Sequence, residues 1–361
     1  MKKICIIAFT DKGIKTAGQI KIILEASLID ESANSLEKSN FEKSYSGNEH
    51  YFVNLLEKNC NKKAYVADNF NCYDAFIFIG ATGIAVRYIA PHIKSKDVDP
   101  AVIVLDEHGD FVIPLLSGHL GGANELASLI AEKLSSTPVI TTATDINAKF
   151  AVDLWTKKTN QYIVDISKIK DVSSAVLKDE HVGLYSDFEI EGILPKQIKL
   201  CDNYADYNPN VGIAVSIDEN IKPFNITLNA VPKLAVIGVG CRKNTDSDSF
   251  ENYILDILRE QNISIHAVDM LASIDIKQDE KCILDFSKKY GIPFKTATAD
   301  ELMNIKGKFT ASSFVKSITG VDNVCERSAA YFSANSKIIL GKTSHNGMTC
   351  AIAVRDWKCK F

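Results

Sequence analysis

The stretch Ala75-Phe-Ile-Phe-Ile-Gly-Ala-Thr-Gly83 indicates the class of the fold. Its five apolar residues have the length of a buried strand, and the glycines that follow are typical of a turn into a helix. A helix is expected from Ile84 to about Ala90, where Pro91 ends it. Strands that alternate with helices are typical of layered α/β domains, which bind ligands at the carboxyl ends of their strands.

The same alternation recurs toward both ends of the chain. Apolar runs at Ile4–Phe9 and Leu234–Val239 each precede a turn and a helical pattern. Residues 147–230 are less regular and carry no strong chemical motif. We therefore predict a multi-domain α/β protein. Layered N-terminal (1–146) and C-terminal (232–361) α/β domains are joined by a small middle domain (147–231).

The composition is that of an ordinary globular protein. Hydrophobic residues make up 46% of the 361 residues and charged residues 24%, which argues against a disordered chain. The formal net charge of −4 argues against a nucleic-acid-binding surface. The apolar run at Ile4–Phe9 is too short for a membrane span or the core of a signal peptide. We expect a cytoplasmic protein with no nucleic-acid or membrane partner.

The nine cysteines are scattered along the chain. None forms a CxxC pair, and none lies near a histidine at the spacing of a zinc site. Most are expected to be reduced, half-buried side chains that pack as small hydrophobic groups. We therefore expect no metal held by the protein itself.

A second stretch, Pro114-Leu-Leu-Ser-Gly-His-Leu-Gly-Gly-Ala-Asn-Glu125, places three glycines, a serine and a histidine just before a helical pattern. Glycines let a ligand approach the backbone, and the first turn of a helix offers N–H groups to an anion. Ser117, His119 and Asn124 would add hydrogen-bonding or acid–base groups. A loop that needs glycine only for tight packing is the alternative, and both interpretations stay open on the residues alone.

Gly80–Gly83 and Gly238–Gly240 both follow a strand and precede a helix. Neither completes the GxGxxG fingerprint of a dinucleotide site, and no Walker lysine–serine pair follows either turn. Binding of NAD or ATP is therefore not expected. Each turn instead carries basic residues, Arg87 in the first and Arg242 with Lys243 in the second. We predict two anion-binding turns.

Other polar clusters have competing explanations. Asp106-Glu-His108 could form an acid–base pair, but a solvated hairpin turn is favoured. His345-Asn-Gly347 is also typical of a turn. Asp145 follows a predicted strand over Pro138–Thr142, where a carboxylate is costly unless it has a function, although it could cap a helix. Ser117 is not part of a G-x-S-x-G motif, so a hydrogen-bond donor is favoured over a nucleophile.

The sequence resembles the cobalamin biosynthesis protein CbiG family over nearly its whole length. The order and spacing of seven segments carry the resemblance, and the block around residues 114–145 is its most specific part. The segments are Gly80–Arg87, Asp99–Glu107, Leu116–Glu125, Val139–Asp145, Ile237–Lys243, Leu271–Lys277 with Glu280, and Val324–Ala330.

The resemblance implies an enzyme, a cobalt-precorrin-5A hydrolase of anaerobic cobalamin (vitamin B12) biosynthesis. That reaction opens a δ-lactone on the macrocycle and releases acetaldehyde to give cobalt-precorrin-5B. The implied partner is a cobalt corrinoid whose carboxylates suit the two basic turns. Cobalt arrives with the substrate, so no cofactor held by the protein is expected. Transient contact with other enzymes of the pathway and a homodimer stay open. A non-catalytic corrinoid carrier or scaffold is the alternative function.

As a hypothesis drawn from the clustered polar groups, His119 acts as general base toward the lactone carbonyl, and N–H groups of Gly121 and Gly122 hold the oxyanion. His119 or Asp145 then removes the proton of the released alcohol. Axial contact with the substrate's cobalt is a competing role for His119. The candidate catalytic residues are His119, Asp145 and Ser117, and the candidate substrate-binding residues are Gly80, Thr82, Gly83, Arg87, Gly118, Gly121, Gly122, Asn124, Gly240, Arg242, Lys243 and Glu326.

Overall fold

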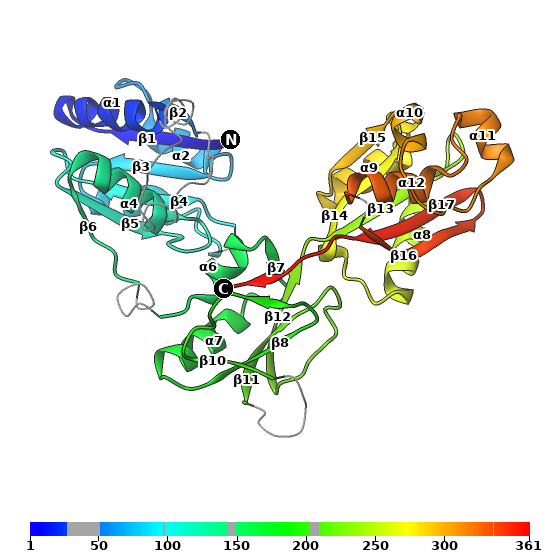
Figure 1. Cartoon of the computed structure of the whole chain (residues 1–361). Coiled ribbons are helices and arrows are strands. Elements are labelled where there is room, and N and C mark those ends of the chain that lie inside the picture. Colours follow the sequence, from blue (N-terminus) through cyan, green and yellow to red (C-terminus); the bar gives the residue numbers. More distant parts are fainter. Residues whose placement is uncertain (27–50, 97, 143–148, 202–208, 335) are drawn as a thin grey trace, which may run out of the picture. The chain divides into compact units, whose positions relative to one another are not determined.

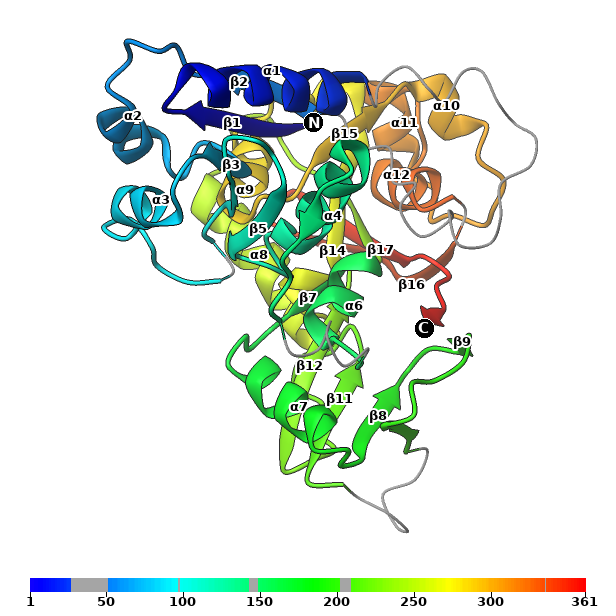
Figure 2. The same cartoon turned by 90° about the vertical axis from the view of Figure 1, so that its left-hand side faces the viewer.

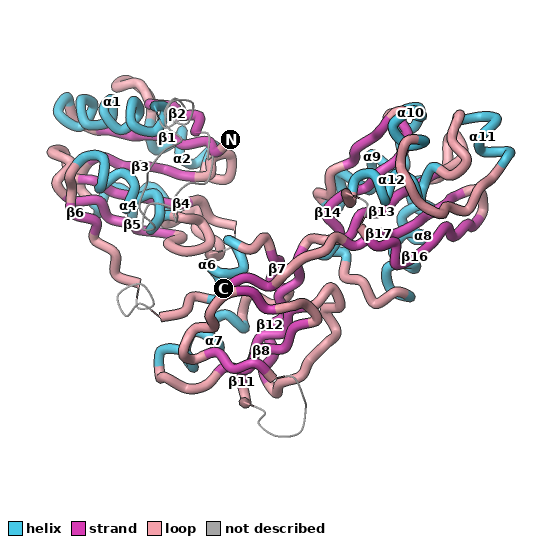
Figure 3. Tube along the Cα trace, viewed as in Figure 1, coloured by secondary structure: helices cyan, strands magenta, loops and turns pink. Residues whose placement is uncertain are grey.

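The computed structural model describes residues 1–26, 51–96, 98–142, 149–201, 209–334 and 336–361. The chain forms two compact units, Met1–Lys149 and Phe150–Phe361, whose elements are labelled in Figure 1. The predicted domain boundary at residues 146 and 147 falls outside the described residues. The second unit contains two separate five-stranded sheets, drawn in magenta in Figure 3.

One six-stranded sheet forms the centre of the first unit, with the strand order β2-β1-β3-β4-β5-β6. Strands β1 to β4 are parallel, β5 is antiparallel to β4, and β6 is parallel to β5. Because β1 lies between β2 and β3, the winding of the chain reverses there, and ligands of doubly wound sheets bind at such a point. The strands are β1 (Lys2–Ala8), β2 (Tyr51–Leu55), β3 (Ala75–Ile79), β4 (Ala101–Leu105), β5 (Phe111–Leu116) and β6 (Thr137–Pro138).

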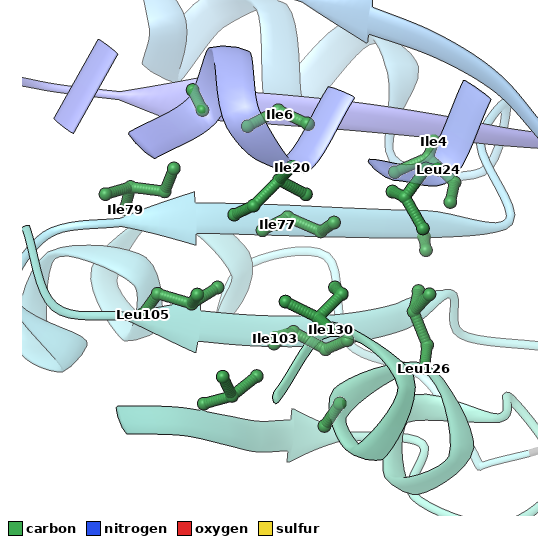
Figure 4. Packing of buried hydrophobic residues seen from close by; sticks show 14 of the residues in the cluster. Ile4, Ile6, Ile20, Leu24, Ile77, Ile79, Ile103, Leu105, Leu126 and Ile130 are labelled. Atoms are coloured by element: carbon green, nitrogen blue, oxygen red, sulfur yellow. The ribbon is translucent and has the colours of Figure 1, made fainter. Parts of the chain in front are cut away.

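Helices cover both faces of this sheet. Alternate strand residues such as Ile4 and Ile77 pack with α1 (Asp11–Ala26) and α4 (Ala123–Leu134), as Figure 4 shows. The intervening strand residues, Phe76 among them, pack with α2 (Lys62–Asn69) and α3 (Thr82–Ile89) on the other face. Burial on both faces explains why these strands read as continuous apolar runs. Each fully buried isoleucine or phenylalanine contributes about 1.5–3 kcal/mol.

The first sheet of the second unit has the strand order β10-β8-β11-β12-β7. Its strands are parallel except β7, which is antiparallel to β12. Buried residues Val172 and Val176 lie on α7, which packs against β8, β11 and β12. The elements are α6 (Val152–Lys158), β7 (Gln161–Ile163), α7 (Lys168–Leu177), β8 (Val182–Ser186), β10 (Ile198–Leu200), β11 (Val211–Val215) and β12 (Ile226–Pro232).

The second sheet of this unit has the strand order β15-β14-β13-β17-β16. Strands β13, β14 and β15 are parallel, whereas the β16–β17 hairpin joins β13 in antiparallel orientation. Helices α8 and α9 pack on one face, and α12 packs against β13 and β14. The elements are β13 (Ala235–Gly240), α8 (Ser247–Glu260), β14 (Val268–Ile274), α9 (Lys281–Tyr290), β15 (Phe294–Ala297), α10 (Ala299–Met303), α11 (Ser313–Thr319), α12 (Val324–Phe332), β16 (Lys337–His345) and β17 (Met348–Val354), with 3-10 turns η3 (Ile265–Ala267) and η4 (Asp275–Lys277).

The last residues of the chain return to the beginning of the second unit. Strand β18 (Cys359–Lys360) pairs in parallel with β9 (Ile190–Glu191), and the two lie side by side in Figure 2. The indole N–H of Trp155 donates a hydrogen bond to the carbonyl of Lys360 at 2.7 Å. The ring of Phe361 stacks on that indole with centroids 4.7 Å apart. This closure joins residues about two hundred positions apart.

The layered α/β class predicted from the sequence is confirmed, and one detail differs. The strand expected over Pro138–Thr142 is confined to Thr137–Pro138. The capping residue of α8 is Asp246, whose carboxylate accepts a hydrogen bond from the Ser249 N–H at 2.9 Å. Among the helices that the structure describes, none has the length and apolar character needed to cross a membrane.

Candidate functional site

The turn at Gly80–Gly83 and the loop at Ser117–Gly122 lie at opposite edges of the sheet of the first unit. The turn lies where the parallel strands end, and the loop lies where they begin. Gly80 follows the carboxyl end of β3, where Ile79 pairs with Leu105. Strand β5 runs the other way, and its last residue, Leu116, pairs with Val102 at the amino end of β4. A strand of five residues separates the two edges by roughly 15 Å. The Gly80 turn and the loop around His119 therefore do not form one site within this unit.

The Gly80 turn has the position of a ligand site, next to the point where the winding reverses. Gly80 has φ +149°, and a Cβ atom there would lie 2.9 Å from the ring of Phe9. Thr82 is the first residue of α3. The exposed Arg87 donates from Nη1 to the Gly83 carbonyl at 3.2 Å, so its guanidinium lies over the first turn of its own helix. The turn thus presents one positive charge close to a helix N-terminus.

The loop that precedes α4 satisfies the first N–H groups of its own helix. The N–H of Gly122 donates to the His119 carbonyl at 3.0 Å, that of Ala123 to the Ser117 carbonyl at 3.1 Å, and that of Asn124 to the Gly118 carbonyl at 3.0 Å. The expectation that this helix offers unpaired N–H groups to an anion is therefore wrong for these three residues. Backbone groups that already have partners gain little from an incoming anion.

Close packing explains two of the glycines in this loop. A Cβ atom on Gly121 would lie 2.4 Å from that of Ser117, and one on Gly118 would lie 2.8 Å from the side-chain oxygen of Asn124. Asn124 is buried, and its amide donates to the Thr142 hydroxyl at 3.0 Å. These distances support the packing explanation that the sequence left open. Gly118 and Asn124 already make these contacts within the protein, so a substrate that bound them would have to compete with those contacts.

The candidate catalytic residues have different environments. Ser117 adopts a left-handed conformation with φ +56°, and its hydroxyl donates to the Asp99 carbonyl at 3.0 Å. The hydroxyl therefore fixes the loop to the start of β4. His119 is half-buried, and the Gly122 N–H holds its carbonyl. Asp145 lies outside the described residues. Hydrogen bonds within the loop therefore hold the main-chain carbonyls of Ser117, Gly118 and His119.

In the second unit, several chemically active side chains lie at the carboxyl edge of the β13–β14 pair. Gly240 ends β13, and Arg242 and Lys243 follow in an exposed turn. The Arg242 N–H donates to the Gly347 carbonyl in the β16–β17 hairpin at 3.1 Å. A Cβ atom on Gly240 would lie 2.7 Å from the Thr349 hydroxyl, which explains the glycine by packing. The turn thus places two cations at the edge where α/β sheets bind ligands.

A thiol pair and an ion pair adjoin this turn. The Sγ atoms of Cys241 and Cys282 are 3.7 Å apart, and Lys277 Nζ lies 2.6 Å from Glu280 Oε1. The hydrogen bond from the Cys282 thiol lowers the pKa of Cys241, and the charge of Lys277 acts in the same direction against the effect of burial. Sequence reasoning gave none of these four residues a site role. The only indication in the sequence that they could belong to a site was their position within or beside segments that carry the resemblance to the CbiG family.

Glu326 is buried in α12 and has four neutral hydrogen-bond donors. Its carboxylate accepts from the Thr310 N–H at 2.7 Å and hydroxyl at 3.0 Å, from the Asn323 amide at 2.8 Å and from the Lys342 N–H at 2.6 Å. The residue Glu326 is 4% exposed to solvent. These contacts connect α12 with β16 and with the segment before α11. They favour a role in positioning these segments over direct contact with a substrate.

Both histidine-containing turns have conformations that explain their sequences. The carboxylate of Asp106 accepts hydrogen bonds from the N–H groups of His108 and Phe111, each at 2.8 Å, which supports the solvated-turn interpretation. Asn346 and Gly347 both have positive φ, as a tight hairpin requires. In the described part of the chain, no group of three or more His, Cys, Asp or Glu side chains is placed to hold a metal.

Taken together, a doubly wound α/β unit and a second unit with basic residues at the carboxyl edge of its sheet define an α/β protein with candidate sites for an anionic ligand. Models of the cobalamin synthesis G family match both units of the chain. The N-terminal model matches residues 64–145, and the C-terminal model matches residues 235–353. The chain belongs to this family.

Curated relatives support the assignment. The chain is 35% identical to a cobalt-precorrin-5A hydrolase of Salmonella typhimurium over 297 residues. The matched region covers 79% of this chain and 83% of the relative. It is 32% identical to a cobalt-precorrin-5A hydrolase of Priestia megaterium, with 79% of each chain covered. A probable cobalt-precorrin-5A hydrolase of Methanocaldococcus jannaschii is 31% identical, with 78% of this chain and 85% of the relative covered.

Among solved structures, a putative cobalamin biosynthesis protein G homolog from Sulfolobus solfataricus is similar over 98% of this chain and 97% of its own, at 24% identity and a TM-score of 0.41. CobE, a protein from the cobalamin biosynthetic pathway, matches 34% of this chain and 91% of its own at 23% identity and a TM-score of 0.32.

Proposed function

We propose that this protein is a cobalt-precorrin-5A hydrolase. The observation that carries the proposal is the 35% and 32% identity, each over 79% of the chain, to two relatives with that name. The family models matched near both ends support it, because the similarity then extends to both units. Cobalt enters this reaction as part of the substrate.

The reaction has two bond-breaking stages. Water adds to the lactone carbonyl and the ring C–O bond breaks, which leaves a carboxylate on the macrocycle and frees a secondary alcohol. A base then removes the alcohol proton, the adjacent carbon–carbon bond breaks, and the conjugated macrocycle accepts the electron pair while acetaldehyde leaves. Both stages require a group that accepts a proton, and neither requires an external oxidant or reductant.

The structure changes the roles that the glycine loop can have in this chemistry. Because the Gly122 N–H donates to the His119 carbonyl, it holds the main chain of the proposed base instead of an oxyanion. Of the two N–H groups predicted to bind the oxyanion, that of Gly121 stays a candidate. The hydrogen bond to its carbonyl would help to position His119 for general base catalysis.

Basic side chains at the turns are proposed to bind the acetate and propionate groups of the corrinoid. Arg242 and Lys243 are exposed at the carboxyl edge of one sheet. Arg87 is exposed at the carboxyl edge of the other, roughly 15 Å from the edge that carries His119, so it would bind a carboxylate remote from the lactone. An arginine can bind a carboxylate with two parallel hydrogen bonds. With a net charge of −4, the protein depends on such local cations to attract an anionic macrocycle.

The function is tested by anaerobic incubation of the purified full-length chain with cobalt-precorrin-5A, with trapping and quantification of acetaldehyde. Release well above the protein-free rate, with a matching fall in the mass of the macrocycle, is the expected result. Tight binding of the corrinoid without acetaldehyde would contradict the hydrolase and favour a carrier that passes the intermediate to another enzyme. Heat-denatured protein is the control.

Arg242→Ala is expected to weaken binding of a stable polycarboxylated cobalt corrinoid about tenfold. A charge-assisted hydrogen bond to a carboxylate contributes roughly 1.5–3 kcal/mol, and exposure to solvent places Arg242 at or below the lower end. The dissociation constant is measured by spectrophotometric titration at two salt concentrations.

Arg259→Ala provides the matched control, because Arg259 is an exposed arginine in the last turn of α8 with its own partner, Asp256, at 2.8 Å. Its dissociation constant should equal that of the parent protein. Equal affinity of the Arg242 and Arg259 variants for the corrinoid would mean that the Arg242 turn does not contact the macrocycle.

A further inference from the structure

The Cys241–Cys282 pair forms a chemical site that hydrolysis does not use. Cys241 follows β13 in a turn without regular secondary structure, whereas Cys282 is the second residue of α9. Their Sγ atoms are 3.7 Å apart, and a disulfide requires about 2.0 Å. The two sulfur atoms are already in van der Waals contact, so closure of roughly 1.7 Å would join them.

The two thiols differ in access to solvent. Cys241 is half-buried at the edge of the sheet, and Cys282 is 1% exposed within the core beneath α9. An external reagent therefore reaches Cys241 first. Cys282 is protected from the same reagent but lies against the sulfur that the reagent would modify. This is the arrangement of an attacking thiol with an internal resolving thiol.

The surroundings favour the thiolate at Cys241. The Cys282 thiol donates toward Cys241 and lowers its pKa, and the nearby Lys277 ammonium also favours the negative charge. Burial and the Glu280 carboxylate oppose these effects at Cys241 without outweighing them, whereas burial dominates at several other thiols. It raises the pKa of Cys5 and of Cys359 to about 12 and that of Cys325 to about 11. Because the thiolate is the reactive form, Cys241 is chemically distinct from these buried thiols.

We propose that Cys241 is a thiol modification site that reacts with small disulfides such as oxidised glutathione, and that Cys282 resolves the product into an internal disulfide. The Cys241 thiolate attacks the reagent and forms a mixed disulfide, and one reagent thiolate leaves. The Cys282 thiol then gives up its proton and attacks the Cys241 sulfur, which expels the second reagent thiol. Two protein thiols are oxidised, and one reagent disulfide is reduced to two thiols.

The closed disulfide would connect the turn that carries Arg242 and Lys243 to the first turn of α9. Cys241 is adjacent to Arg242 in the chain, and the Lys277–Glu280 ion pair precedes α9 directly. The cross-link thus acts on the same edge of the sheet as the proposed carboxylate-binding residues. The thiol chemistry itself requires no corrinoid, so it can be tested independently of the proposed function.

The test exposes the full native chain to oxidised glutathione at neutral pH, followed by acid quenching and peptide mapping by mass spectrometry. A peptide cross-linked between Cys241 and Cys282 is expected. The exposed Cys72 is an internal reference that can gain glutathione. If Cys282 stays reduced while Cys241 keeps its bound glutathione in the parent protein, the resolving role is wrong. If Cys241 stays unmodified while Cys72 reacts, the modification site is wrong.

Two substitutions at Cys282 separate its roles. Cys282→Ser keeps a hydrogen-bond donor and removes the resolving thiol, so the mixed disulfide at Cys241 should persist and the cross-link should be lost. Cys282→Ala removes the donor as well, so the pH at which Cys241 reaches half its maximal alkylation rate by iodoacetamide should rise relative to Cys282→Ser. Identical pH profiles for the two variants would contradict the proposed stabilisation of the Cys241 thiolate by Cys282.

Discussion

His119→Ala is expected to lower the single-turnover rate of acetaldehyde release by roughly 10²–10⁴-fold, the usual contribution of a general base. The variant should keep its fold, because the half-buried imidazole is not part of the buried core and the Gly122 N–H bonds the main chain of residue 119. Rapid mixing with excess enzyme under anaerobic conditions measures the chemical step apart from product release.

His108→Ala is the matched control for this prediction. His108 is an exposed histidine of the same unit, in the turn between β4 and β5 at the opposite edge of the sheet from His119. Its rate should stay within a factor of two of the parent. A similarly small effect of His119→Ala would remove His119 as the base. A shift of the bound corrinoid's visible spectrum with little loss of rate would instead assign His119 to contact with the cobalt.

Gly238→Ala is expected to destabilise the second unit by about 3 kcal/mol or more, the upper range for overpacking. A Cβ atom on Gly238 would lie 1.8 Å from the carbonyl oxygen of Cys325 and 2.9 Å from the N–H nitrogen of Ala329. Both are backbone atoms of α12, so no side-chain rotation relieves the clash. The helix would have to move away from β13, and the buried Glu326 would lose its fixed donors.

Urea unfolding followed by tryptophan fluorescence measures this loss. Both tryptophans, Trp155 and Trp357, belong to the second unit, so their signal follows that unit alone. With a typical urea m-value of about 1–3 kcal/mol/M, the midpoint should fall by roughly 1 M or more.

Gly18→Ala tests whether any added methyl group has this effect. Apart from the neighbouring backbone of α1 itself, no atom of the described residues lies within 4 Å of a Cβ placed at Gly18, and alanine in a helix interior is favoured over glycine by roughly 0.5–1 kcal/mol. Its stability, measured by circular dichroism, should be unchanged or higher. An unfolding midpoint of Gly238→Ala equal to that of the parent protein would mean that α12 is not packed against β13 as described.

Elements with strong local signals could be predicted from the sequence. The apolar run at Ala75–Ile79 is the strand β3, and the helix expected from Ile84 to about Ala90 is α3 (Thr82–Ile89). Burial on both faces makes such strands continuous in sequence, and glycine and proline limit them. The middle part was less predictable because its strands, such as β10 (Ile198–Leu200), are short and half-exposed, so their pattern is weak.

The arrangement of the site could be predicted only in part. The sequence identified the glycine turns and favoured a hairpin at Asp106–His108, but it did not relate them to one another. The antiparallel pairing of β5 with β4 places the glycine turns of the first unit at opposite edges of the sheet. The sequence left both an anion site and tight packing open for the glycines before α4, because self-capping by the Ser117 and Gly118 carbonyls leaves no sequence signature. Cys241 and Cys282 are 41 positions apart, and only the neighbouring carboxyl ends of β13 and β14 bring them together.

The return of the C-terminus to β9 has a consequence for how the protein is made. Strand β9 and the Trp155 ring emerge from the ribosome long before Lys360 and Phe361, their partners in pairing and stacking. At typical rates of synthesis of about 5–20 residues per second, this interval lasts on the order of 10 to 40 s. The middle part of the chain is therefore translated early but completed last, and during translation it exposes an indole and a strand edge that chaperones can bind.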